Sequence, residues 1–181
     1  MICDEHKTIF IHIPRNAGSS IKQAFNRAKD SSPNYKTIEE VNKEYGPSIQ
    51  SYYKWTIVRN PWSRELSLYH YALEKKLIND VSFEEYLQLI KDQTTKNLIL
   101  EKNQIEYFTI EDYVEVDQIV RLEYISGAWK KVCEQLKIDP VTLTQTNQSE
   151  NTKNHYTKKC IDLVAEIRKQ DIEFLNYDCP Y

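Results

Sequence analysis

Short apolar runs alternate along this chain with longer segments in which apolar residues recur every three or four positions. Residues 8–13 form a β-branched and aromatic run, which predicts a strand. After a turn, the apolar residues that follow Ser19 have helical spacing, which predicts a helix. The same order recurs at residues 55–59, which predict a second buried strand, and after Asn60 and Pro61, which predict a loop and then a helix through about residue 76.

The rest of the chain continues this alternation. Thr37 and Ser82 each stand three residues before a Glu, and this capping-box pattern predicts a helix directly after each of them. Residues 118–122 predict a third strand and residues 125–136 a helix, while Thr157 is expected to begin one last amphipathic helix.

Strands that alternate with helices are typical of α/β proteins. We therefore predict a single domain over residues 1–181, with a central, mainly parallel sheet flanked by helices. Residues 96–111 fit neither periodicity, and the polar residues 142–154 predict a loop.

Composition narrows the classes of function. The chain has 181 residues, of which 40% are hydrophobic and 28% charged, as in an ordinary soluble protein. Its net charge of -3 argues against nucleic acid as a partner. No apolar run approaches the roughly 18 residues of a membrane span. The polar residues 1–7 do not resemble a signal peptide. We expect a cytoplasmic protein with no membrane span.

Four cysteines are present, and none forms a C-x-x-C pair or stands at metal-ligand spacing from a histidine. This pattern predicts free thiols in a reducing compartment and no metal site.

The first candidate site is the loop that joins the first strand to the first helix. Phosphate groups bind at such helix N-termini, because unpaired N–H groups and the positive end of the helix dipole point at the anion. We predict that the loop binds a phosphate through Arg15, Asn16, Ala17, Gly18, Ser19 and Ser20. No Lys stands between Gly18 and the serines, so the loop is not a Walker A motif. A plain strand-to-helix turn is the alternative interpretation.

The second candidate site follows the second strand. Arg59 is expected at the carboxyl end of that strand, where open α/β sheets bind ligands. Ser67 follows eight residues later, within the next helix, so the two side chains could bind one phosphate together. A salt-bridged Arg and a surface Ser are the alternative.

Residues 11–21 and 56–69 together resemble the two cofactor-binding segments of sulfotransferases, in particular the carbohydrate sulfotransferases. The resemblance implies a P-loop-like fold and the donor PAPS (3′-phosphoadenosine 5′-phosphosulfate), which leaves as PAP. It places Arg15 at the oxygen that bridges phosphate and sulfate, and Ser19 and Ser20 at the 5′-phosphate. It places Arg59 and Ser67 at the 3′-phosphate.

The general base is less clear, because many relatives carry a His on the segment just before the second strand, and residues 34–40 of this chain contain none. His70, three residues after Ser67, is our first choice, and Lys36 or a Glu among residues 39–44 are the alternatives. Lys153 and Tyr156 precede the last helix, where relatives close over the cofactor, and we expect both to contact it.

The sequence thus predicts a PAPS-dependent transfer of a sulfuryl group to an acceptor hydroxyl, on a carbohydrate or glycolipid, without a metal. The alternatives are a P-loop nucleotide kinase or phosphotransferase and an inactive PAP-binding module. The short chain leaves little room for an acceptor domain, so the acceptor site is expected to be open or shared with a second copy of the chain.

Overall fold

A computed structural model describes residues 1–25, 35–95, 97–139, 143 and 155–181. The chain divides into two compact units. The first comprises Met1–Val58 and Glu106–Asn147, and the second comprises Arg59–Ile105 and Gln148–Tyr181. Each unit has a hydrophobic core of its own. The single domain expected over residues 1–181 stays a prediction.

The first unit contains a four-stranded sheet in the order β1-β2-β3-β6. The strands are β1 (Ile2–Cys3), β2 (Thr8–Ile11), β3 (Tyr53–Val58) and β6 (Gln118–Arg121). Strand β1 is antiparallel to β2, whereas β2, β3 and β6 are parallel neighbours. The chain therefore leaves β2 and β3 at the same edge of the sheet. The α/β class with a mainly parallel sheet is confirmed.

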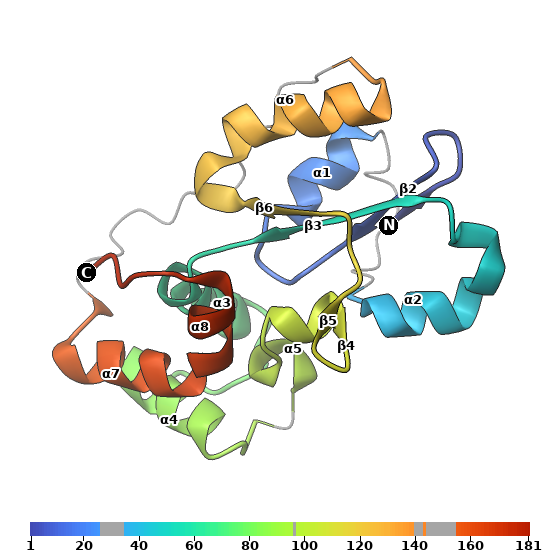
Figure 1. The fold of residues 1–181 in the computed structure, drawn as a ribbon. Coiled ribbons are helices and arrows are strands. Elements are labelled where there is room, and N and C mark those ends of the chain that lie inside the picture. The colour runs from blue at the N-terminus through green and yellow to red at the C-terminus, as the bar shows by residue number, and fades with distance from the viewer. Residues whose placement is uncertain (26–34, 96, 140–142, 144–154) are drawn as a thin grey trace. The chain divides into compact units, whose positions relative to one another are not determined.

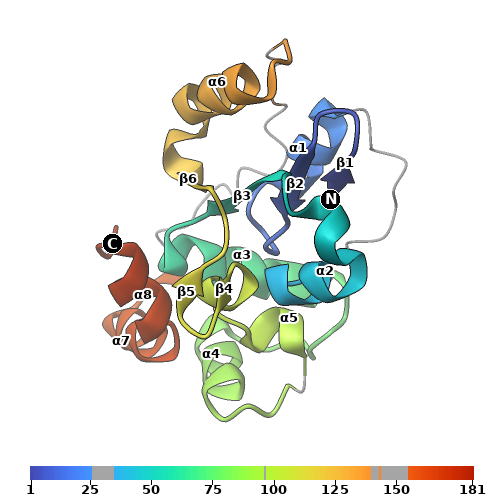
Figure 2. The same cartoon turned by 45° about the vertical axis from the view of Figure 1, so that its right-hand side comes forward.

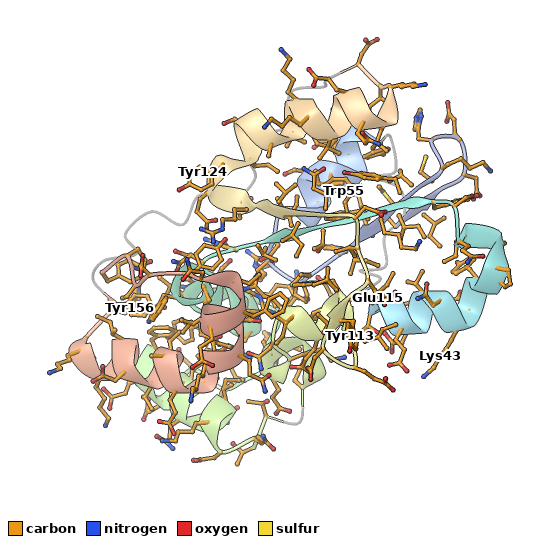
Figure 3. All side chains as sticks on the ribbon, in the orientation of Figure 1. Lys43, Trp55, Tyr113, Glu115, Tyr124 and Tyr156 are labelled. Carbon is orange, nitrogen blue, oxygen red and sulfur yellow. The ribbon has the colours of Figure 1, made fainter. Side chains whose placement is uncertain are left out.

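Two helices, α1 (Gly18–Ala24) and α6 (Ile125–Leu136), lie on the same face of this sheet, as both views show (Figures 1 and 2). The apolar residues of α6 recur at helical spacing and point inward. Burial of each large apolar side chain contributes about 1.5–3 kcal/mol. This layer, in which Figure 3 labels Trp55, is formed by Phe10, Ile21, Trp55, Ile57, Val120, Trp129, Val132, Cys133 and Leu136.

The first unit also contains helix α2 (Ile38–Tyr45), the 3-10 helix η1 (Gly46–Ile49) and a small hairpin of β4 (Thr109–Ile110) and β5 (Tyr113–Val114). The predicted capping box at Thr37 is confirmed, because its side chain accepts from the Glu40 N–H and the Glu40 carboxylate accepts from the Thr37 N–H. The hairpin was not predicted. Its turn residues, Glu111 and Asp112, both have positive φ without the glycine that usually marks such a turn.

The second unit is helical. It contains α3 (Pro61–Glu74), α4 (Phe83–Lys91), α5 (Leu98–Glu101), α7 (Lys158–Ile167) and α8 (Lys169–Leu175). The second predicted capping box, at Ser82, begins α4. Two short 3-10 helices of the chain, η2 (Ile105–Tyr107) and η3 (Leu122–Tyr124), complete the described secondary structure.

The prediction of one last helix from Thr157 is wrong, because the helix is interrupted at Arg168. The guanidinium of Arg168 is buried against the Glu65 carboxylate, with its Nε 2.6 Å from Oε2. It also donates to the carbonyls of Leu100 and Glu101. Hydrophobic periodicity continues through this break, so the pattern alone did not reveal it.

Candidate functional site

The loop between β2 and α1 has a strained backbone. Arg15 and Ala17 adopt positive φ, 68° and 59°, which costs non-glycine residues roughly 1–2 kcal/mol each. Ala17 is the N-cap of α1 and has no side chain to satisfy the first N–H groups of the helix. Strain of this kind is concentrated at functional loops. The loop geometry is therefore suited to an anion at the start of α1.

Asn16 attaches the loop to the sheet. Its side chain is buried, and its Nδ2 donates to the carbonyl of Ile57 in β3 at 2.7 Å. Strand β2 ends at Ile11, opposite Thr56, so this side-chain amide pairs with the next carbonyl along β3. Of the two serines, Ser19 is exposed and Ser20 is buried.

The buried ring of His12 explains why position 18 is glycine. A Cβ atom built on Gly18 would lie 1.7 Å from the Nε2 atom of His12. The imidazole is 7% exposed, and its ring centroid lies 5.9 Å from that of Phe10 and 4.8 Å from that of Tyr35. Among the described residues, its Nδ1 has no hydrogen-bond partner. The absence of a side chain at Gly18 thus leaves room for the buried imidazole, independently of any anion that binds at the loop.

His12 is neutral at physiological pH. Burial lowers the pKa of His12 from 6.5 to about 3, and the charges of Lys22 and of the N-terminal amine act in the same direction. Lys22 is itself buried, one helical turn after Gly18. Sequence reasoning missed this lysine, although its i+4 spacing from Gly18 places both residues on one side of α1.

The second motif begins with a well-capped helix. The side-chain Oδ1 of Asn60 accepts from the N–H groups of Trp62 and Ser63, at 3.2 and 3.4 Å. Pro61 stands at the first helical position, which favours the same start. Arg59, directly before this cap, is partly buried, and Ser67 is buried in the second turn of α3.

Two histidines meet in the second unit. His70 is exposed on α3, and its ring centroid lies 5.3 Å from that of His155 in an edge-to-face arrangement. The sequence did not indicate this pair, because the two residues are far apart along the chain.

Tyr156, which is expected to contact the cofactor, uses its hydroxyl within the protein. The hydroxyl donates to the Trp62 carbonyl at 2.6 Å, and the ring stacks on that of Tyr181 with 4.2 Å between the ring centroids. Figure 3 labels Tyr156. Burial, and then the Glu65 carboxylate, raise the pKa of Tyr156. Lys153, the other residue expected there, lies outside the described residues.

A family model described as the sulfotransferase family matches residues 1–178, nearly the whole chain. The chain belongs to the sulfotransferase family. Enzymes of this family transfer sulfuryl groups and generally use PAPS as the donor. No curated protein matches the chain, and no solved structure matches it either. The resemblance to sulfotransferases is therefore confirmed, and the carbohydrate branch stays a prediction.

The alternative candidates for the general base, which lie on α2 or just before it, form ion pairs or a helix cap. Lys36 pairs with Glu44, and this hydrogen bond raises the pKa of Lys36, which disfavours the neutral amine that a base requires. Glu39 pairs with Lys43 at 2.6 Å, and Glu40 completes the capping box. His70 remains our first choice.

The described residues contain no group of three or more His, Cys, Asp or Glu side chains that is placed to hold a metal ion. In the same part of the chain, every helix is too short or too polar to cross a bilayer.

Proposed function

We propose that this sulfotransferase transfers a sulfuryl group from PAPS to an acceptor hydroxyl. The observation that carries the proposal is the strained loop at residues 14–17, which leads into an uncapped N-terminus of α1. The backbone N–H groups and the positive dipole end of a helix start suit the doubly charged 5′-phosphosulfate. PAPS, when bound, supplies the sulfuryl group on a good leaving group, so the reaction requires no metal.

Residues of the loop are proposed to bind the 5′ end of PAPS. The backbone of Asn16, Ala17 and Gly18 and the hydroxyls of Ser19 and Ser20 would donate to phosphate oxygens. Asn16 supports this role through its bond to β3, which holds the loop in its strained shape.

Arg15 is proposed to stabilise the negative charge that develops on the leaving oxygen. A guanidinium does not release its proton at neutral pH, so its contribution is electrostatic. Removal of one such preorganised donor typically costs about 2.7–4 kcal/mol of transition-state stabilisation.

His70 is proposed as the general base that removes the acceptor proton, a step worth about 10²–10⁴-fold in rate. Its exposure leaves it accessible to an acceptor, and the neighbouring ring of His155 limits its rotation. His70→Ala should lower turnover and leave the affinity for PAP unchanged. Equal turnover would remove His70 from the mechanism.

Arg59 and Ser67 are proposed to recognise the 3′-phosphate, which distinguishes PAPS from other adenine nucleotides. Calorimetric titration with PAP and with adenosine 5′-monophosphate, which differ only in the 3′-phosphate, tests this assignment. Arg59→Ala should weaken PAP binding about a hundredfold and leave the monophosphate nearly unchanged, since charge-assisted bonds contribute about 1.5–3 kcal/mol each. Lys130→Ala, which removes a charge from the exposed face of α6, is the control.

A thermal-shift titration with PAP, and with ATP and Mg²⁺, separates the alternative functions. Stabilisation by ATP with Mg²⁺, and none by PAP, would indicate a phosphotransferase instead. Tight PAP binding without transfer to any acceptor in a broad panel would indicate an inactive binding module.

A carbohydrate or glycolipid is the proposed acceptor class. Two tyrosines of the first unit, Tyr113 and Tyr124, are 74% and 68% exposed, and both are labelled in Figure 3. Exposed aromatic rings stack well on the apolar faces of sugars. Transfer to phenols but to no glycan would overturn this choice. The four free cysteines, Cys3, Cys133, Cys160 and Cys179, favour a reducing compartment, and we propose the cytoplasm.

A further inference from the structure

Gln104 holds both backbone groups of Arg59. Its Oε1 accepts from the Arg59 N–H at 2.8 Å, and its Nε2 donates to the Arg59 carbonyl at 2.9 Å. A side-chain amide that pairs with the N–H and C=O of one residue imitates a neighbouring strand. Arg59 directly follows β3, so Gln104 keeps its backbone extended where the strand has ended.

Gln104 is completely buried, with 0% of its surface exposed. A buried amide must satisfy its donor and its acceptor, and Arg59 satisfies one of each. Arg59 is 45 residues away along the chain, so these two bonds fix a long-range position and do not stabilise a local turn.

Asp171 in turn holds the segment that carries Gln104. One carboxylate oxygen accepts from the Gln104 N–H at 2.9 Å, and the other accepts from the Ile105 N–H at 3.0 Å. This aspartate is also 0% exposed and lies in the first turn of α8. A buried carboxylate is expensive to desolvate, and two backbone donors offset part of that cost.

Arg168 supports the same segment one helical turn earlier. Its guanidinium donates to the carbonyls of Leu100 and Glu101, and its ion pair with Glu65 ties it to α3. Two buried charged side chains at the start of α8 therefore hold residues 100–105, from which Gln104 reaches Arg59.

We infer that Gln104 and Asp171 are positioning residues for recognition of the 3′-phosphate. They fix the backbone of Arg59, and with it the point from which the guanidinium extends toward the phosphate. A bidentate contact between guanidinium and phosphate depends on this placement. The inference rests on the proposed function, which gives Arg59 its role.

Gln104→Met is the principal test, because methionine keeps the length and most of the volume of the side chain and loses both hydrogen bonds to Arg59. We expect its affinity for PAP to fall about tenfold more than its affinity for adenosine 5′-monophosphate, a shift that corresponds to one misplaced charged contact. Gln104→Glu keeps the acceptor for the Arg59 N–H but places a carboxylate oxygen opposite the Arg59 carbonyl, so its selective loss should be at least as large.

Tyr69→Phe is the matched control. It removes one hydrogen bond of the same unit, from the buried Tyr69 to the Val81 carbonyl at 2.8 Å, which lies outside the contacts of Gln104, Asp171 and Arg168 described above. A purely structural effect lowers the binding of both nucleotides equally, and this is the result expected for Tyr69→Phe.

The outcomes separate the two claims. If the wild-type enzyme binds both nucleotides equally, the proposed function fails and the inference fails with it. If the wild type prefers PAP and Arg59→Ala abolishes that preference, the proposed function stands and only the inference is tested. The inference would be overturned if Gln104→Met kept the wild-type preference for PAP, or if Gln104→Glu and Asp171→Asn both kept it.

Discussion

The contact between Gly18 and His12 permits a sharp test of how the loop is built. In Gly18→Ala the new Cβ atom would lie 1.7 Å from Nε2, 2.0 Å from Cδ2 and 2.3 Å from Cε1 of the imidazole. Non-bonded heavy atoms require about 3.5 Å, so the ring or the helix must move by about 1.8 Å to clear the closest contact. The rings of Phe10 and Tyr35 limit the movement of the imidazole.

Overpacking of this kind typically costs about 1–3 kcal/mol, and we expect Gly18→Ala to lie near the upper end of that range. His12→Ala removes the ring and is itself destabilising, by about 2–5 kcal/mol for a large buried side chain. In the double variant the added methyl group enters space that the ring has left. The combined loss should therefore be smaller than the sum of the two single losses, by about 1–3 kcal/mol.

Urea unfolding of the four proteins measures this coupling. Intrinsic fluorescence is a suitable signal, because Trp55 and Trp129 lie 6.1 Å apart in the core that contains Phe10. Additive losses, within about 0.5 kcal/mol, would refute the steric explanation of Gly18. The glycine would then be required for another reason, such as the approach of an anion.

Further predictions concern charge. Because His12 titrates at about 3 when folded and at 6.5 as a free side chain, the unfolded chain binds the extra proton first as the pH falls. Stability should therefore decrease by about 2 kcal/mol between pH 7 and pH 5, and His12→Phe should flatten this profile in urea titrations. Arg168→Met leaves the Glu65 carboxylate buried without its cation and should cost about 3–5 kcal/mol in thermal unfolding; a loss below about 1 kcal/mol would contradict the buried pair. Arg15→Ala should reduce turnover about a hundred- to thousandfold with an unchanged melting temperature, and normal turnover would exclude Arg15 from catalysis.

Local signals in the sequence predicted most elements correctly. The capping boxes at Thr37 and Ser82 begin helices in the structure, as predicted. The helix expected after a loop at Asn60 and Pro61 is also present, and it begins directly at Pro61. These signals succeed because a cap and the N–H groups that it accepts from lie within three residues of each other. The loop after the first strand was located for the same reason, since strand, turn and helix succeed one another directly.

Signals failed where the decisive partner was distant. Nothing in residues 96–111 indicates that Gln104 pairs with the backbone of Arg59, or that Asp171 holds Gln104 from 67 residues away. The break at Arg168 has the same cause, since it accompanies a buried ion pair with Glu65, 103 residues earlier.

The sequence by itself determined where most helices and the parallel strands lie, and where the loop proposed to bind an anion follows a strand, because short-range hydrogen bonding and hydrophobic periodicity decide these features. Tertiary structure alone decided which side chains support that loop and Arg59. Buried polar groups must find partners, and in this fold the partners of Gln104 and Asp171 come from segments that only folding brings together.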